Sequence, residues 1–305
     1  MPLRDIHAME PTAGRFKLHQ VGLSGIRKPL SIRRADRVVT LATTFDVAVD
    51  LPSTRKGSDL SRNAILLAEI VDETAVRPAS SLESACVAIA RELLERHKYA
   101  STATVDASAE YFLRRGITEE RKSFEDYSLL ASAQSARSRP GGPVTVTKSI
   151  GAEAVGMTAC PCAMETSREA LSEEFPLLRD PSMRSMPMIT HNQRNRTRLM
   201  FDLTDEVEIE VDDLIETIEA AQSSPTYAIL KRGDEARMVI EAHRHPKFVE
   251  DVLRDLLRRV ARGFTNVPDT SFVRARTVSE ESIHKYNVVA AHQATLGELR
   301  ESSGA

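Results

Sequence analysis

The sequence contains few cysteines, no long apolar run and no large excess of charge of either sign. Three cysteines in 305 residues are too few for a disulfide framework, which favours a reducing compartment. No stretch approaches the roughly 18 apolar residues of a transmembrane helix. The formal net charge of −3 gives no basic footprint for nucleic acid. We therefore expect a soluble protein with neither a nucleic-acid nor a membrane partner.

The chain also lacks the short motifs of several large enzyme classes. It has no P-loop, no G-x-G-x-x-G fingerprint, no G-x-S-x-G elbow and no H-E-x-x-H helix. Kinases, dinucleotide oxidoreductases, α/β-hydrolases and zincins therefore lose their usual sequence support. Residues 1–15 contain no apolar signal-peptide core, so we expect a cytoplasmic protein.

What is present is enough apolar sequence for packed cores. The hydrophobic fraction is 41%, and the length suffices for two ordinary domains. In the first half, apolar periodicity predicts a strand, two helices and two strands, at residues 37–50, 60–73, 82–97, 101–113 and 123–136.

The second half repeats this order after SRPGGP (138–143), the clearest turn signal of the chain. Its predicted elements are an extended segment, a strand pair, two helices and two closing strands, at residues 144–157, 196–211, 212–221, 247–264, 272–278 and 286–291. Because the strands come in adjacent pairs, we predict antiparallel sheets and an α+β fold of two tandem units, residues 20–137 and 144–300. The alternative is a chance likeness between two unrelated α+β domains.

Two thiols lie close together at Cys160 and Cys162. Pro161 between them predicts a short, stiff hairpin. A C-x-C spacing without a second cysteine pair excludes a cysteine-only metal site, so any metal must also recruit histidine or carboxylate ligands. Such a mixed set leaves room for water and is typical of catalytic sites. The alternative is two buried, inert thiols.

Other polar residues are candidates for the same chemistry. His191 lies in a polar cluster just before a strand, and Glu281 and His284 are spaced to reach one ion. Glu250 lies in the first turn of a helix, where the helix dipole favours an anion, and KRGDEAR (231–237) predicts a turn. Solvated loops, exposed ion pairs and simple helix-end electrostatics are the alternatives.

Several basic residues accompany these candidates. They are scattered surface charges by default, but a converging set would suit a triphosphate, whose oxygens pair with guanidinium forks and ammonium groups. The basic residues near the candidates are Arg55, Lys56 and Arg62 in the first half and Arg194, Arg196, Arg198 and Lys285 in the second, with Lys231 in the 231–237 segment.

Taken together, the motifs resemble one enzyme family. The sequence is similar to GTP cyclohydrolases of the second sequence family, which comprises bacterial type IB enzymes and archaeal iron(II)-dependent enzymes of methanopterin biosynthesis. The matching motifs cover most of the chain in family order: GLSGIRKPL (22–30), DLPSTRKGSDLSR (50–62), GMTACPC (156–162), THNQR (190–194), ILKRGDE (229–235), PKFVED (246–251), ESIH (281–284) and ATLGEL (294–299).

The resemblance implies the tunnelling fold, in which each subunit carries two antiparallel ββααββ units. It also implies a homotetramer with active sites at subunit interfaces. GTP is the implied substrate, and iron(II) is the expected metal, with zinc and manganese as alternatives.

The resemblance further implies roles for individual residues. Cys160, His191 and Glu235 would ligate the metal, and Glu281 and His284 would share the pocket as ligands or proton relays. Glu250 would anchor the guanine. The implied catalytic residues are thus Cys160, Glu250, Glu281 and His284, and the implied substrate-binding residues are Glu250, Arg194, Lys231, Lys56 and Arg62.

The long stretch between Cys162 and His191 favours the archaeal branch. In that branch GTP yields formate and 7,8-dihydroneopterin 2′,3′-cyclic phosphate, whereas the bacterial branch forms the triphosphate for folate or queuosine synthesis. This chain departs from the family at Tyr286, where a second histidine is common, and at Asp59, where bacterial members tend to carry histidine. A tunnelling-fold enzyme of other specificity and a non-enzymatic purine-binding protein stay open as alternatives.

Overall fold

The computed structural model describes residues 5–34, 37–139, 141–204 and 206–304. The chain divides into two compact units. The first unit comprises Met1–Glu110, Leu129–Ile150 and Asp202–Glu208, and the second comprises Tyr111–Ser128, Gly151–Phe201 and Ile209–Ala305.

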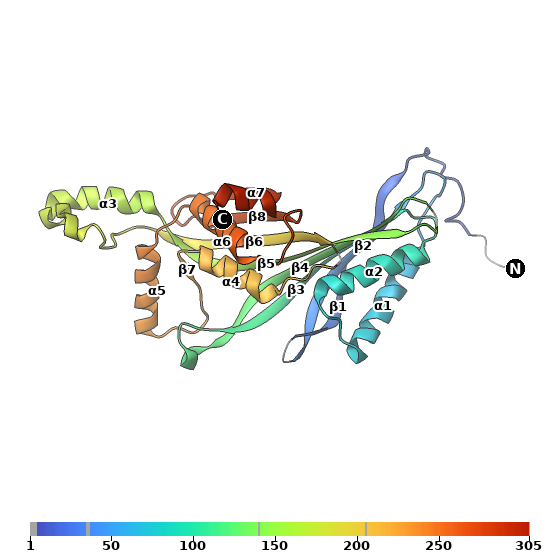
Figure 1. The fold of residues 1–305 in the computed structure, drawn as a ribbon, viewed down its shortest axis with the longest axis horizontal. Coiled ribbons are helices and arrows are strands. Elements are labelled where there is room, and N and C mark those ends of the chain that lie inside the picture. Colours follow the sequence, from blue (N-terminus) through green and yellow to red (C-terminus); the bar gives the residue numbers. More distant parts are fainter. Residues whose placement is uncertain (1–4, 35–36, 140, 205, 305) are drawn as a thin grey trace. The chain divides into compact units, whose positions relative to one another are not determined.

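In the first unit, two long strands form an antiparallel ladder beside two helices (Figure 1). Alternate residues of β2, including Leu41, Phe45 and Val47, are buried, as the sequence alternation predicts. Ser81 caps α2: its hydroxyl accepts from the Ser84 backbone N–H at 3.2 Å. The elements of this unit are β1 (Leu18–Arg33), β2 (Val38–Leu51), α1 (Leu60–Val76), α2 (Leu82–Arg96) and parts of β3 (Thr102–Arg115), β4 (Ser123–Arg137) and β5 (Val144–Ala159).

In the second unit, α6 packs against β8 and β9, and α7 packs against β9 (Figure 1). Val252, Leu256 and Val260 of α6 are fully buried, and the ring of Phe264, just after α6, lies 4.9 Å from that of Phe201 on β6. The further elements of this unit are α3 (Pro161–Glu174), most of β6 (Asn192–Thr204), α4 (Val211–Ala221), β7 (Ser224–Pro225), α5 (Arg232–Arg244), α6 (Val249–Gly263), β8 (Phe272–Ser279), β9 (Val288–Thr295) and α7 (Leu296–Ser303).

Within the described residues the strands follow the order β1-β2-β3-β4-β5-β6-β8-β9, and β7 pairs with β5. The neighbouring pairs β1–β2, β2–β3 and β8–β9 are antiparallel. The predicted α+β class with an antiparallel sheet is therefore confirmed. Among the described helices, none has the length and apolar character that crossing a bilayer requires.

Three local predictions are wrong. Residues 196–211 are not a strand pair: β6 ends at Thr204, and the alternating acidic segment after it leads into α4. Residues 231–237 are not a turn but the start of α5, whose polar composition hides its helical period. Pro161 does not make a hairpin, because it occupies the first position of α3, where its missing N–H costs nothing.

The predicted turn at 138–143 joins β4 to β5, although residue 140 lies outside the described residues. The Gly142 N–H donates to the Arg139 carbonyl at 2.9 Å. Gly141 has a φ of 71°, in the left-handed region that favours glycine.

Candidate active site

Cys160 and His191 are neighbours in the second unit, although 30 residues separate them. The Cys160 N–H donates to the His191 carbonyl at 3.1 Å. The Thr190 hydroxyl donates to the Cys160 carbonyl at 2.7 Å. Two hydrogen bonds therefore fasten the start of α3 to the start of β6.

The Cys160 side chain lies at the N-terminus of α3. Its Sγ accepts from the Ala163 backbone N–H at 3.5 Å. The thiol is thereby held at the end of the helix that carries unpaired N–H groups. Cys162, in contrast, is exposed in the first turn of the helix.

The His191 ring is held in one orientation. Its Nδ1 lies 2.9 Å from Oε1 of Gln193, an amide oxygen that only accepts, so Nδ1 carries the proton. The Gln193 amide nitrogen donates in turn to the Ser279 hydroxyl at 3.1 Å. The contacts of the ring with the described residues all use Nδ1, so Nε2 is the nitrogen that could bind a metal, as in metal-ligating histidines.

Glu281 lies beside His191. One carboxylate oxygen is 3.8 Å from Nδ1 of His191, and the other accepts from the Ser279 hydroxyl at 2.8 Å. The side chains of His191 and Glu281 are only 13% and 10% exposed. The structure thus groups Cys160, His191 and Glu281 by backbone and side-chain contacts.

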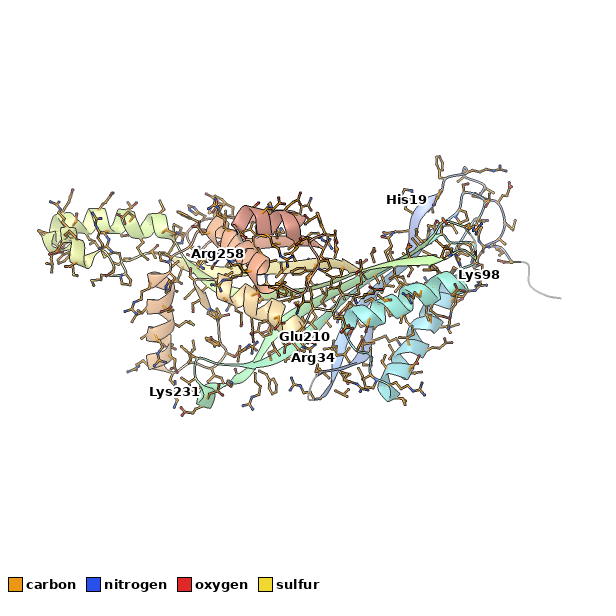
Figure 2. The ribbon with its side chains drawn as sticks, viewed as in Figure 1. His19, Arg34, Lys98, Glu210, Lys231 and Arg258 are labelled. Atoms are coloured by element: carbon orange, nitrogen blue, oxygen red, sulfur yellow. The ribbon has the colours of Figure 1, made fainter. Side chains whose placement is uncertain are left out.

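The other predicted residues of the second unit are exposed on separate segments. Glu235 lies in the first turn of α5, close after Lys231, which is labelled in Figure 2. Glu250 lies in the first turn of α6, and the His284 ring stacks on Tyr286 with centroids 5.0 Å apart. No hydrogen bond or ion pair joins Glu235, Glu250 or His284 to Cys160 in the described part of the chain, so their roles stay predictions.

A different group of residues brings its possible metal-ligand atoms close together. Asp5, His7 and Asp59 of the first unit are the residues, among those described, whose ligand atoms all lie within 4.8 Å of one another. Asp59, however, also pairs with the guanidinium groups of Arg62 at 3.2 Å and Arg55 at 3.6 Å. Two cations on one carboxylate oppose a divalent ion there, so we assign this group to charge pairing.

Lys56 and Arg62 flank this group in the loop that precedes α1 and in the helix's first turn. Arg62 donates from Nη1 to the Arg96 carbonyl at 2.9 Å. Arg194, another basic candidate, is exposed on β6 of the other unit.

A buried chain of hydrogen bonds supports the loop before α1. Tyr99 OH lies 2.7 Å from Oγ of Ser58 and 2.9 Å from Nδ1 of His97. Nε2 of His97 lies 2.6 Å from Oδ1 of Asn63. Burial, and then the charge of Arg62, lower the pKa of His97. The neutral ring therefore donates from Nε2 to Asn63 and accepts from Tyr99.

Sequence reasoning missed Gln193, His97 and Tyr99. The signal for Gln193 was available, because residues two apart on a strand share a face and Gln193 follows His191 by two. His97 and Tyr99 gave no comparable signal, since they reach Asn63 and Ser58 only through the packing of α2 against α1.

Comparison with solved structures identifies the fold. The chain matches the uricase from Arthrobacter globiformis with a TM-score of 0.50 and 9% identity, covering 91% of this chain and 93% of that one. It matches a uricase from Bacillus fastidious with a TM-score of 0.51 and 8% identity, covering 94% and 96%. These likenesses confirm the tunnelling fold.

Comparison with known sequences identifies the family. The chain is 39% identical over 290 residues to GTP cyclohydrolase MptA of Methanothermobacter thermautotrophicus, covering 93% of this chain and 91% of that protein. It is 39% identical over 307 residues to GTP cyclohydrolase MptA of Methanosarcina acetivorans, covering 98% and 96%. The model of the family described as type I GTP cyclohydrolase folE2 matches residues 3–290. The chain therefore belongs to the type I GTP cyclohydrolase folE2 family and is a GTP cyclohydrolase.

Proposed function

We propose that this GTP cyclohydrolase uses a metal ion, opens the imidazole ring of guanine, releases formate and forms 7,8-dihydroneopterin 2′,3′-cyclic phosphate together with diphosphate. The observation that carries the metal is the oriented His191 ring, whose Nδ1 is occupied by Gln193 beside Cys160. The product is inferred from the MptA relatives and from the long segment between Cys162 and His191. The product would serve a methanopterin-type pterin pathway.

The donor set fits a borderline divalent ion. Cys160 offers a soft thiolate, His191 an imidazole nitrogen, and Glu235 or Glu281 a carboxylate; His284 is a further candidate. Iron(II) is our expected metal, and zinc and manganese accept the same donors. A metal bound there lowers the pKa of a coordinated water, so that hydroxide is available near neutral pH.

The chain's own residues bind the substrate and move protons. Glu250 is proposed to accept hydrogen bonds from N1–H and the exocyclic amine of guanine and so to hold the base in place. Glu281, whose carboxylate lies 3.8 Å from Nδ1 of His191, is proposed to take and return a proton as the ring opens. Arg194, Lys231, Lys56 and Arg62 are proposed to neutralise the triphosphate.

The assembly is part of the proposal. We infer a cytoplasmic homotetramer whose active sites lie at subunit interfaces, because the family resemblance implies such an arrangement. The basic residues Lys56 and Arg62 and the Cys160 group would then come from different protomers at one site.

The decisive experiment is product analysis. The full chain, loaded anaerobically with iron(II), is incubated with GTP, and the products are separated by mass spectrometry. We expect formate and a pterin of the cyclic-phosphate mass. A triphosphate product would assign the protein to the bacterial type of reaction instead, and absence of formate with iron, manganese and zinc would contradict the metal-dependent reaction.

A further inference from the structure

The start of α5 has little packing of its own to hold it. Only Asp234 and Ala242 of this helix are buried. The residues between β7 and α5, 226–231, form neither helix nor strand. This segment and the first turn of α5 nevertheless carry Lys231 (Figure 2) and Glu235, to which the proposed function assigns binding of the triphosphate and of the metal. What fixes the position of these two side chains therefore lies outside α5.

The β3–β4 hairpin reaches this segment within the same unit (Figure 1). β3 and β4 are neighbours in the sheet and are joined by residues 116–122, a connection short enough only for an antiparallel pair. A Cβ atom at Gly116 would lie 2.2 Å from the Arg121 carbonyl oxygen, so a larger residue there would force the turn open. The tip of the hairpin is therefore tightly closed.

Two contacts fasten the hairpin to α4, a helix with a buried apolar face. Tyr127 donates from its hydroxyl to Oε1 of Glu219 at 2.6 Å, and Arg115 donates from Nη2 to Oε1 of Glu216 at 2.9 Å. Tyr127 is buried, and this burial raises the pKa of its hydroxyl, which therefore keeps the proton that it donates. The hairpin is thus a fixed support for whatever it contacts.

Glu125 extends this support to the segment before α5. It is buried and shares one face of β4 with Tyr127, two residues further along. Both of its carboxylate oxygens lie 3.0 Å from the backbone nitrogen of Ala228, whose N–H they accept, and the Ser123 hydroxyl donates to one of them. No lysine or arginine forms an ion pair with Glu125 within the described ranges of the chain. These donors therefore compensate the burial of its charge.

Arg121 extends the support to α5 itself. Its guanidinium donates to Oδ2 of Asp234, and the same oxygen accepts from the Lys231 N–H at 3.1 Å. A hydrogen bond between two charged groups is stronger than one between neutral groups. Because Asp234 lies directly before Glu235, the bond from Arg121 fixes the helical turn to which Glu235 belongs.

The hairpin thereby holds the segment at two points, Ala228 and Asp234. We propose that Glu125 and Arg121 are positioning residues of the cyclohydrolase reaction, which hold residues 228–235 so that Lys231 and Glu235 are presented to GTP and to the metal. This inference rests on the proposed roles of Lys231 and Glu235. Neither Glu125 nor Arg121 touches the substrate in this role, because each acts through the group that it holds.

Metal titration of the chelated full chain with iron(II) alone, under anaerobic conditions, tests the role of Glu125. Glu125→Ala should bind iron(II) about tenfold more weakly, because the Ala228 N–H loses its acceptor and Glu235 loses its fixed position. Glu125→Gln retains an acceptor oxygen and should recover most of the affinity. Asp126→Ala is the matched control, since Asp126 is the next residue on β4 and is exposed on the opposite face. Equal affinity in Glu125→Ala and Asp126→Ala would overturn the proposal.

A second pair of variants covers the case in which Glu125→Ala does not fold. Arg121→Gln removes the charged donor to Asp234 from a side chain that is 29% exposed. Lys122→Gln is its control, because it removes the neighbouring charge, which pairs with Glu119 at 2.7 Å. Arg121→Gln should weaken iron(II) binding about tenfold and raise the KM for GTP, whereas Lys122→Gln should change neither. Wild-type values in Arg121→Gln would overturn its positioning role.

Hydrogen exchange shows whether the variants act by the proposed route. Exchange should become faster at residues 228–235 of Glu125→Ala and stay unchanged in α6. The Thr226 hydroxyl still donates to the Val155 carbonyl at 3.0 Å in that variant and holds the β7 end of the segment. A merely structural role would lower the folded fraction and leave the KM and the metal affinity of the folded protein unchanged. Faster exchange without weaker metal binding would therefore overturn the proposal.

The test of the products and the test of the positioning role fail independently. The products that the wild type forms from GTP decide the proposed function, whereas the ratio of iron(II) affinities between variant and wild type decides the positioning role. Glu235→Ala connects the two and should lose at least as much affinity as Glu125→Ala. Retention of iron(II) by Glu235→Ala, together with its loss from Glu125→Ala, would overturn the positioning role and leave the wild type's products unaffected.

Discussion

At the scale of single residues, the Gln193 amide decides what the His191 ring can do. Its oxygen receives the Nδ1 proton and its nitrogen is engaged by Ser279, so the amide cannot turn without losing a bond. Partners of this kind fix the tautomer and raise the basicity of a ligating histidine. Gln193 is therefore a positioning residue.

Gln193→Leu should weaken metal binding by about 10- to 100-fold, because the His191 ring loses the acceptor that orients it. Metal titration of the chelated protein measures this loss. Gln193→Glu retains an acceptor oxygen and should recover much of the affinity. If Leu and Glu at this position gave the same affinity as glutamine, the positioning role would be wrong.

Cys160→Ala should abolish metal retention after gel filtration, measured by elemental analysis, because the thiolate is the soft ligand of the set. Cys162→Ala is the matched control: it removes a thiol two residues away that is exposed on α3. We expect the control to retain metal. Equal metal content in both variants would show that the ligand lies elsewhere.

The sequence identifies the candidate metal ligands better than it identifies the residues and elements that hold them. Cys160 and His191 are recognisable because unusual residue types stand at a strand end, and the structure joins them by a backbone hydrogen bond. The helix that starts at Pro161 is not recognisable from the sequence. A proline between two thiols indicates a hairpin as readily as a helix start, because its missing N–H is harmless in a first helical turn.

At the scale of elements, Lys247 fastens the entrance of α6. Its Nζ donates to the Ala221 carbonyl and to Asp255 Oδ2, each at 2.8 Å, and its N–H donates to the Ala159 carbonyl at 3.1 Å. One side chain thereby joins the end of α4 to α6, close to the strand end that leads to Cys160. Burial raises the pKa of Asp255, but hydrogen bonds from Lys247 and Arg258 outweigh it and lower the pKa to about 2.

Lys247→Met should lower the free energy of unfolding by about 2 kcal/mol, because it leaves the half-buried Asp255 with fewer charged donors. A lowered carboxyl pKa contributes stability above its unfolded value of 3.8 that is lost as the pH falls through about 2. The wild type should therefore lose stability between these pH values, and the variant should lose less. Urea unfolding at pH 2–7 measures both effects.

The control for this change is Lys98→Met, which removes an exposed pair with Glu95 at 2.6 Å. Pairs that remain this solvated contribute at most about 1 kcal/mol. If Lys247→Met were as mild as Lys98→Met, the fastening role would be refuted.

The hydrogen bonds that support the loop before α1 depend on the neutral form of His97. His97 is buried and its pKa is lowered by burial and by Arg62. The unfolded chain therefore binds a proton at a higher pH than the folded chain does, so stability should fall as the pH is lowered below about 6.5 and level off below the folded pKa.

His97→Gln should remove this part of the pH dependence, measured by urea unfolding between pH 5 and 8. His19→Gln is the control, because His19 is exposed on β1 (Figure 2) and should leave the pH profile unchanged. A wild-type profile that is flat through this range would show that His97 titrates normally.

At the scale of the whole molecule, hydrophobic periodicity predicted the elements with a clear buried face, such as β2 and α6, but not β1, α3 or α5. The alternation around Phe45 and the apolar stripe of α6 both report burial on one face, which is what periodicity encodes. The polar helix α5 was not predicted, because its Asp234 and Glu235 resemble turn residues and only Asp234 and Ala242 are buried. Contacts between distant segments, such as Gln193 with Ser279, have no trace in local pattern.

The distribution of the proposed site over the chain permits a test of the assembly. Lys56 and Arg62 belong to the first unit, whereas Cys160 and His191 belong to the second. If each site takes one group from each of two protomers, then an inactive Arg62→Ala chain and an inactive Cys160→Ala chain complement each other. Random mixing of equal amounts restores about a quarter of the wild-type sites in such an assembly, since only one protomer order in four joins two intact halves.

The two variants should be mixed after reversible dissociation, and formate release from GTP measured with iron(II) present. Mixing without dissociation, and mixing either variant with itself, are the controls and should stay inactive. Recovery near a quarter supports interfacial sites, and sedimentation of the mixed protein then gives the subunit number. Absence of recovery in a verified mixed oligomer would mean that each site is built within one chain, because both halves of a site must then be intact in the same polypeptide.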